Sequence, residues 1–268
     1  MWSFEHEPDR ARFTERYTLS SDTPAECATK LAAAEADIGL VPVAALASTP
    51  SLAVIPGCAI ASRDRVRSIV LVVRSPDGIA GVHRVALDTA SRTSAAYTRI
   101  LFAKFWKREP EFLPHAPDLD AMLRVADAAL LIGDPALLAL EDREARERRT
   151  GERLLYLDLA HEWFKFTGTV WVSAVWAVRP EAIAGSSIAA AQVVADFQHS
   201  RDQGLAHIDD LADEWSARID IPRRTIHTYL SQNIWYLLDE PCLQGLELFY
   251  RYGAECAGLP AAPMLRFL

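Results

Sequence analysis

Cysteine is scarce in this chain of 268 residues, and no two of its four cysteines are close enough to form a C-x-x-C pair. Thiols spaced in this way are typical of reduced, mostly buried side chains, and not of a disulfide framework or a redox pair. The sequence also shows no N-terminal segment with a basic start and an apolar core. These observations predict a cytoplasmic protein. The cysteines are Cys27, Cys58, Cys242 and Cys256.

Long apolar runs and an excess of basic residues are missing as well. The nearest candidate for a membrane span, residues 169–178, contains Trp and Ser and falls short of the ~20 apolar residues that a spanning helix needs. Asp and Glu (36) outnumber Lys and Arg (28), so the net charge is −8. A sequence-independent grip on nucleic acid requires a basic face. We therefore expect neither a membrane nor a nucleic acid as partner, and we expect local donors to hold any anionic ligand.

The signatures of several enzyme classes are absent. His161 and Glu162 begin like the zinc motif H-E-x-x-H, but Lys165 stands where the second His is required. Neither G-x-S-x-G nor G-x-G-x-x-G occurs, and the seven histidines lack the spacing of metal ligands. The sequence therefore predicts no metal and no cofactor, and it identifies no catalytic side chain.

Strand-like and helix-like segments alternate over the first two-thirds of the chain. The clearest strand lies within 66–76, which is rich in β-branched residues and ends in Ser-Pro. Helices are expected over 24–34, with Thr23 as N-cap, and over 94–107. From residue 187 onward the apolar residues recur with helical spacing. This order predicts an α/β fold with mostly parallel sheets flanked by helices, and a helical C-terminus.

Hydroxyl and guanidinium groups gather where one predicted strand passes into a helix. Ser91, Arg92, Thr93 and Ser94 stand at this point in a row. The N-terminus of a helix leaves backbone N–H groups without partners and carries partial positive charge. The hydroxyls can cap these groups or add donors, and Arg92 can bind a carboxylate through two hydrogen bonds. The stretch therefore predicts either a small-anion site or an ordinary capped helix with Arg92 in solvent.

A second turn has the same layout. Gly133, Asp134 and Pro135 separate an apolar strand from a helix, with Asp134 as the expected N-cap and Gly133 able to let a ligand approach the backbone. Ser68 and the pair Pro42–Val43 stand near the ends of two other strands. In a chain without a phosphate-loop motif, these turns suggest a small anion bound between two lobes. Plain helix capping is the alternative.

Five stretches of the chain are similar, in the same order, to one known family: ADIGLVPVAAL, PGCAIASRDRVRSIVLV, LDTASRTSAA, DAALLIGDPAL, and YLDLAHEWFKFTG with VWAV. They resemble a periplasmic-binding-protein-like family of menaquinone biosynthesis enzymes. The resemblance implies a two-lobed type II periplasmic-binding-protein-like fold with the ligand in the cleft between the lobes. It places residues 1–75 and 180–268 in lobe one and residues 76–179 in lobe two.

The resemblance also implies an activity, which is the loss of water from chorismate, a dianion, on the futalosine route to menaquinone. Such an enzyme is a carbon–oxygen lyase. The stretch 91–94 would bind the substrate from lobe two with Gly133 and Asp134, and Ser68 and Pro42–Val43 would face them from lobe one. Two alternatives stay open, namely the sister activity that forms 1,4-dihydroxy-6-naphthoate and the non-catalytic binding of a small anion. A homodimer also stays open.

One departure from the family pattern lies at the N-terminus. Family members begin with a strand and a turn that carries an Asn, just ahead of the segment that corresponds to residues 1–7. This strand is central in the fold, and its loss would cost more than the ~5–15 kcal/mol by which a typical domain is stable. We therefore expect the first strand of lobe one, with the family's Asn, to be encoded upstream of Met1.

Overall fold

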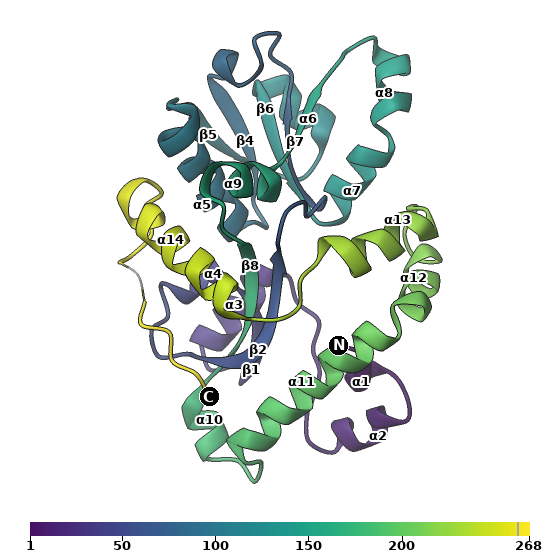
Figure 1. Cartoon of the computed structure of the whole chain (residues 1–268), viewed down its shortest axis with the longest axis vertical. Coiled ribbons are helices and arrows are strands. Elements are labelled where there is room, and N and C mark those ends of the chain that lie inside the picture. Colours follow the sequence, from purple (N-terminus) through teal and green to yellow (C-terminus); the bar gives the residue numbers. More distant parts are fainter. Residues whose placement is uncertain (262) are drawn as a thin grey trace.

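The computed structural model describes residues 1–261 and 263–268, and within them it contains two sheets that lie one above the other in Figure 1. The three-stranded sheet has the order β1-β8-β2, and the five-stranded sheet has the order β5-β4-β6-β3-β7. The strands are β1 (Ile38–Pro42), β2 (Ala53–Ser62), β3 (Ile69–Val73), β4 (Arg84–Asp88), β5 (Glu111–His115), β6 (Ala128–Ile132), β7 (Leu155–Asp158) and β8 (Trp171–Val178).

The α/β architecture expected from the sequence is confirmed, but the strand directions differ from the expected mostly parallel sheets. Strand β8 runs antiparallel to both β1 and β2, and β3 runs antiparallel to both β6 and β7. Among the eight strands described, β4 alone pairs in parallel with other strands, namely β5 and β6. The reason is that β3 and β8 each follow a crossing of the chain from one sheet to the other. Each of them enters its new sheet against the direction of its neighbours.

The two crossings also define the lobes. The chain leaves the three-stranded sheet after β2 and returns to it at β8, after helix α9 (Leu159–Thr167). We call residues 63–68 and 168–170 the two linkers, residues 69–167 lobe two, and the rest lobe one. The boundaries expected from the sequence, after residues 75 and 179, put β3 in lobe one and β8 in lobe two. In the structure β3 belongs to the sheet of lobe two and β8 to the sheet of lobe one. Local sequence shows where a strand lies, but it does not show which strands it pairs with.

Lobe one is completed by helices from both ends of the chain (Figure 1). Helix α3 begins at Pro24 with Thr23 as its cap, as expected, and Thr23 and Glu26 form a reciprocal capping box. The helical region expected beyond residue 187 is also confirmed. In the described part of the chain, β1 pairs with β8 alone, so it is an edge strand. The helices are α1 (Trp2–Glu5), α2 (Asp9–Thr14), α3 (Pro24–Ala32), α4 (Val43–Leu46), α10 (Pro180–Ala184), α11 (Ala190–Ala206), α12 (Ile208–Ser216), α13 (Arg223–Thr228), the π-helix η3 (Tyr229–Asn233) and α14 (Glu240–Cys256).

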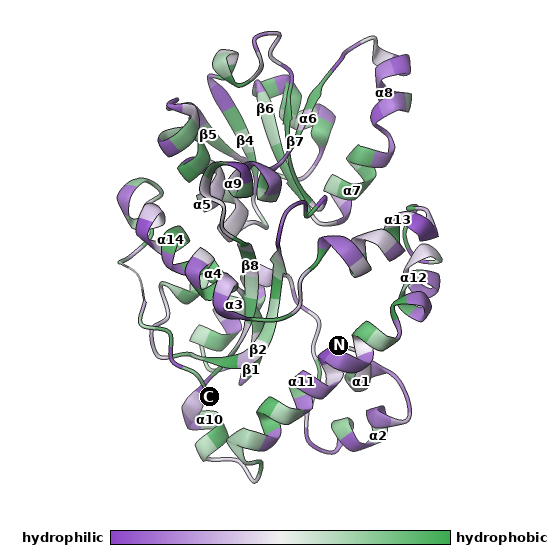
Figure 2. Cartoon of the chain, viewed as in Figure 1, coloured by the Kyte–Doolittle hydropathy of each residue, from purple (hydrophilic) through white to green (hydrophobic). Residues whose placement is uncertain are grey.

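Helices flank the sheet of lobe two. Figure 2 shows its strands as largely hydrophobic and α8 as largely hydrophilic. The helix expected over 94–107 starts two residues earlier, and its second half is a π-helix. Besides α9, the helical elements are η1 (Gly78–Gly81), α5 (Arg92–Ile100), the π-helix η2 (Leu101–Trp106), α6 (Leu119–Val125), α7 (Asp134–Glu141) and α8 (Arg143–Thr150).

Aromatic packing joins the two lobes at α5. The ring of Tyr97 stacks on Trp171 of β8 with ring centroids 3.6 Å apart, and it meets Phe249 of α14 at 4.2 Å. Tyr97 and Trp171 are fully buried, and the Val172 N–H donates to the Tyr97 hydroxyl at 3.3 Å. Stacked aromatic pairs are worth about 0.5–1.5 kcal/mol beyond their buried area. Helix α5 is therefore fixed against lobe one along its inner face.

The four thiols are free, and Cys58 and Cys242 are buried. Burial raises the pKa of Cys58 to about 11 and that of Cys242 to about 12. Because the thiolate is the reactive form, both side chains are inert near neutral pH. None of the helices among the described residues is long and apolar enough to cross a membrane.

Candidate functional site

Ser91 is the N-cap of α5, so the capping expected at this turn exists. Its Oγ accepts a hydrogen bond from the Ser94 N–H at 3.2 Å, and its own N–H donates to the Asp88 carbonyl at 3.1 Å. The N–H groups of Arg92 and Thr93 find no acceptor among the described residues, as is usual for the first groups of a helix. The helix dipole adds partial positive charge at the same place. The free N–H groups at this end of α5 can therefore donate hydrogen bonds to an anionic oxygen.

Thr93 connects α5 to the other lobe. Its Oγ1 accepts a hydrogen bond from the Ala44 N–H at 3.2 Å, and both residues are buried. Ala44 belongs to α4, which begins at Val43 after Pro42. The Tyr250 hydroxyl of α14 donates to the Val43 carbonyl at 2.9 Å and so holds the turn at residues 42–43 in place. The structure thus brings the 91–94 turn of lobe two against the 42–43 turn of lobe one.

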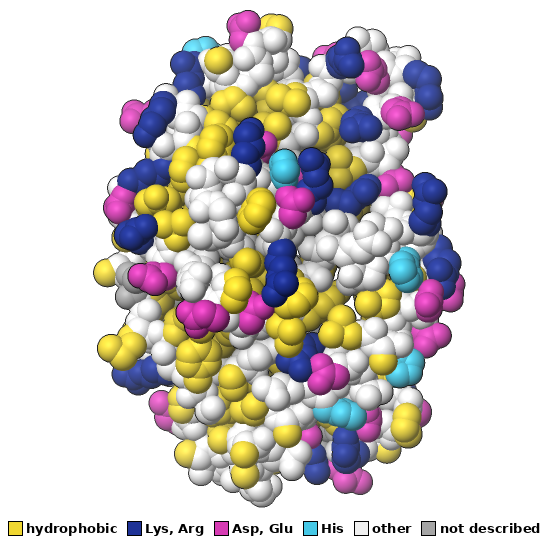
Figure 3. Space-filling model, in the orientation of Figure 1, with side chains coloured by type: hydrophobic (Ala, Val, Ile, Leu, Met, Phe, Trp, Pro, Cys, Tyr) yellow, Lys and Arg dark blue, Asp and Glu magenta, His cyan; other side chains and the backbone are white. Residues whose placement is uncertain are grey.

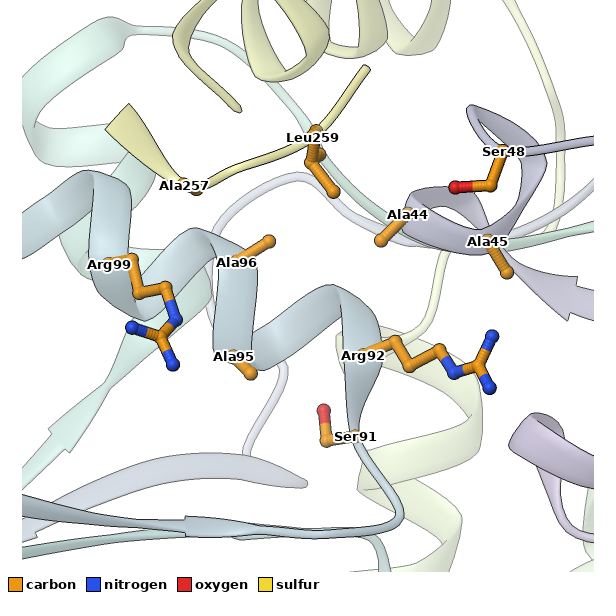
Figure 4. Close-up of a pocket in the computed structure, with 10 residues that line it drawn as sticks. All are labelled: Ala44, Ala45, Ser48, Ser91, Arg92, Ala95, Ala96, Arg99, Ala257 and Leu259. Carbon is orange, nitrogen blue, oxygen red and sulfur yellow. The ribbon is translucent and has the colours of Figure 1, made fainter. Parts of the chain in front are cut away.

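A cavity of about 340 Å³ opens beside this contact (Figure 4). Its volume lies within the range of about 300–1,000 Å³ that is usual for small-molecule sites. Of the residues singled out by the sequence, Ser91 and Arg92 line it, whereas Thr93 and Ser94 face the protein interior. The lining comes from α4 and the turn after it, from α5 and its N-cap, and from the chain after α14: Ala44, Ala45, Ser48, Ser91, Arg92, Ala95, Ala96, Arg99, Ala257 and Leu259.

Two guanidinium groups belong to this lining. Arg92 is exposed and Arg99 is half-buried, and they lie seven positions apart on α5. Burial lowers the pKa of Arg99, and no charged group among the described residues opposes this effect. The Arg99 guanidinium lies over the Phe112 ring, 4.3 Å from its centroid. The sequence points to Arg92 but not to Arg99, although residues seven apart share one helix face.

Ser68, Gly133 and Asp134 gather at a second place, where β3 begins and β6 ends. The Gly133 N–H donates to the Ser68 carbonyl at 2.8 Å, and the Tyr229 hydroxyl donates to Ser68 Oγ at 3.0 Å. Ser68, Gly133 and Asp134 are not among the residues that line the cavity. The expectation that Asp134 caps α7 is wrong, because Asp134 is the first helical residue and Gly133 precedes it. This turn needs a φ of +62°, which glycine adopts most readily, so the cap position falls on a residue without a side chain.

A carboxylate that sequence reasoning passed over connects the two groups. Asp88 is buried, its Oδ1 accepts a hydrogen bond from the Ala90 N–H at 2.9 Å, and the Ile132 N–H also points at it. Burial raises the pKa of Asp88, although the two N–H groups act in the opposite direction. Asp88 thereby ties the turn before α5 to the turn before α7. An Asp at the end of a strand is usually a solvated turn residue, so nothing in the sequence marked it.

Charges of both signs are spread over the surface of the molecule. Figure 3 shows acidic and basic side chains interspersed over the face of the molecule drawn there. With a net charge of −8, the molecule as a whole repels an anion. Attraction must therefore come from local groups, and the cavity supplies them through Arg92, Arg99 and the end of α5.

Comparison with known proteins identifies the family. A family model described as menaquinone biosynthesis matches residues 2–255. This protein belongs to that family. A curated relative, the chorismate dehydratase of Thermus thermophilus, is 32% identical over 222 residues, which cover 80% of this chain and 76% of the relative.

Solved structures support the fold of this menaquinone biosynthesis protein. A protein from Archaeoglobus fulgidus matches with a TM-score of 0.64 at 16% identity, over 94% of this chain and 92% of that one. The periplasmic aliphatic sulphonate binding protein of Escherichia coli matches with a TM-score of 0.59 at 14% identity, over 95% and 88% of the two chains. The periplasmic-binding-protein-like fold expected from the sequence is confirmed. At these identities the likeness concerns the fold alone.

Proposed function

We propose that this protein is a chorismate dehydratase of the futalosine route to menaquinone. Its family membership and the relative from Thermus thermophilus support this activity. The structural observation that carries the proposal is the cavity between α4 and α5, where Arg92 and the free N–H groups of α5 meet the turn of the other lobe. Chorismate carries two carboxylates, and such a cavity offers a carboxylate a guanidinium and helix N–H donors.

The reaction removes the 4-hydroxyl and a ring proton from chorismate. The ring already contains two double bonds, so this loss makes it aromatic and leaves the enolpyruvyl ether of 3-hydroxybenzoate and water. The driving force lies in the substrate. The protein then has to orient the substrate, exclude water and stabilise developing charge. An enzyme with this activity is a carbon–oxygen lyase.

The residues of this chain divide that work. One carboxylate is bound by Arg92, the Ser91 hydroxyl and the free N–H groups of α5. The Thr93–Ala44 hydrogen bond holds the two lobes together beside it. None of the described residues that line the cavity carries a carboxylate, an imidazole or an amine. This supports removal of the ring proton by a carboxylate of the substrate itself, which the fixed orientation brings within reach.

Incubation of the purified protein with chorismate tests the proposal. We expect an aromatic product, followed by absorbance and chromatography, and a much weaker reaction for Arg92→Ala. Binding of chorismate without product would favour a non-catalytic anion-binding protein, and absence of binding would favour the sister activity that forms 1,4-dihydroxy-6-naphthoate. A cytoplasmic location and a homodimer stay predictions, which cell fractionation and light scattering of the purified protein would test.

A further inference from the structure

Arg99 lies at the end of the cavity away from Arg92, and the proposed function assigns it no role. Arg99 lines the cavity and is half-buried, and its guanidinium lies over the Phe112 ring. It forms no salt bridge with an acidic side chain in the described part of the chain, whereas Arg146, also in lobe two, pairs with Asp120 and Glu152. Half-burial of a cation without a counter-charge carries a desolvation cost, which the Phe112 ring offsets in part and a ligand carboxylate would offset further.

The two arginines mark opposite ends of one cavity. Arg92 and Arg99 lie seven residues apart on α5, which corresponds to a rise of about 10 Å along the helix. Figure 4 shows Ala95 and Ala96 between them, and Ala44 and Leu259 across from them. These small and apolar side chains leave space between the two charges and provide no donor of their own. The polar groups of the cavity are thus concentrated toward its ends.

We propose that Arg99 forms a second carboxylate-binding subsite, which makes the cavity selective for dicarboxylates. The inference rests on the proposed function, because it assigns the second carboxylate of the substrate to a residue that neither the sequence motifs nor the turn geometry includes. One carboxylate is bound at the Arg92 end and the other at the Arg99 end, with the ring over Ala95 and Ala96. Stacking on Phe112 holds the Arg99 guanidinium in place and leaves its N–H groups free to bind the ligand.

Two stable probes test the subsite without any turnover. Titration calorimetry would compare benzoate with benzene-1,3-dicarboxylate on the wild-type protein, on Arg99→Ala and on Arg99→Lys. Arg148→Ala is the matched control, because Arg148 is exposed on α8 in the same lobe and its loss changes the net charge equally. We expect the wild type to prefer the dicarboxylate about 10-fold or more, which is typical of one charge-assisted hydrogen-bonded pair. Arg99→Ala should lose this preference with little change for benzoate.

Two results would overturn the subsite. One is a wild-type protein that binds both probes equally, and the other is an Arg99→Ala protein that keeps the full preference. Arg99→Lys retains the charge and should retain part of the preference, so it decides the matter if Arg99→Ala does not fold. A purely structural Arg99 would alter the melting temperature and leave the preference intact, which also counts against the proposal. Chorismate turnover by the wild type is measured separately, so failure of the proposed activity is distinguishable from failure of the subsite.

Discussion

The Oγ1 atom of Thr93 lies 3.2 Å from the backbone nitrogen of Ala44, and this hydrogen bond joins the first turn of α5 to the first turn of α4. The two helices belong to different lobes, and the candidate cavity opens directly beside their contact. This hydrogen bond adds to the packing of Tyr97 on Trp171 and Phe249, which also holds α5 against lobe one. Its removal should affect stability and catalysis together.

Thr93→Val keeps the shape of the side chain and removes the acceptor. The buried Ala44 N–H then has no partner, which typically costs about 1–3 kcal/mol of unfolding free energy. We expect this loss in urea denaturation and a lower kcat/KM for chorismate. Thr93→Ser restores the acceptor and should recover most of both. Unchanged stability in Thr93→Val would show that the Ala44 N–H does not depend on Thr93.

Arg92→Ala removes an exposed guanidinium from the cavity. We expect the KM for chorismate to rise about 10-fold or more, because a charge-assisted bidentate contact is lost. The melting temperature should change little, because the side chain is exposed and makes no hydrogen bond with the described residues. Ser94→Ala should weaken turnover less, since the cap uses only the Ser94 backbone N–H. Wild-type kinetics in Arg92→Ala would remove Arg92 from the substrate site.

Gly133→Ala tests the turn before α7. An added Cβ would meet nothing within 4 Å, so the effect of the substitution is confined to the backbone. Gly133 has φ +62° and ψ −141°, close to a region that other residues rarely enter and where strain of about 1–3 kcal/mol is usual. We expect a lower melting temperature for this variant. Gly151→Ala is a milder control, because Gly151 has φ +70° and ψ 0°, in the left-handed helical region. If Gly133→Ala loses no more stability than Gly151→Ala, the backbone at residue 133 is not strained by a side chain.

The pH dependence of stability should reveal Asp88. Its pKa in the folded chain is raised above the ordinary 3.8 by burial, so the folded state binds the proton more tightly than the unfolded state does. Ionisation of Asp88 therefore lowers stability as the pH rises from 3.8 through the raised value. Asp88→Asn does not ionise and can still accept from the Ala90 N–H. Relative to the wild type, its unfolding free energy should increase as the pH rises from 3.8 through the raised pKa. A constant difference over this range would refute the raised pKa.

Features that depend on neighbours in sequence were predictable. The Thr23 cap and the start of α3 at Pro24 follow from local hydrogen-bonding rules, and the structure confirms both. Capping by a hydroxyl of residues 91–94 was one expected alternative, and the structure assigns it to Ser91. The ordered stretches led to the correct fold, because a family resemblance carries tertiary information that periodicity lacks. Asp134 shows the limit of local rules, since the positive φ of Gly133 shifted the cap by one residue.

Features that depend on distant segments could not be predicted. The partners of β3 and β8 are set by how the chain crosses between the sheets, and each strand looks alike in either lobe. A stretch with as many charges of both signs as 141–149 is typical of a solvated face, yet Arg146 within it is buried and pairs with Asp120 and Glu152. Arg99 became a candidate only when the chain after α14 closed the cavity over it.

Because Trp171 stacks on Tyr97 of α5, its fluorescence depends on how α5 packs against lobe one. Trp171 is fully buried, and its ring stacks on Tyr97 of α5, a helix that also lines the cavity. Any displacement of α5 from lobe one would admit water to this indole and shift its fluorescence to longer wavelengths. Of the seven tryptophans, Trp171 and Trp163 are fully buried, and both rings contact Tyr97. Tryptophan fluorescence of the unlabelled protein would therefore report whether ligand binding displaces α5 from lobe one.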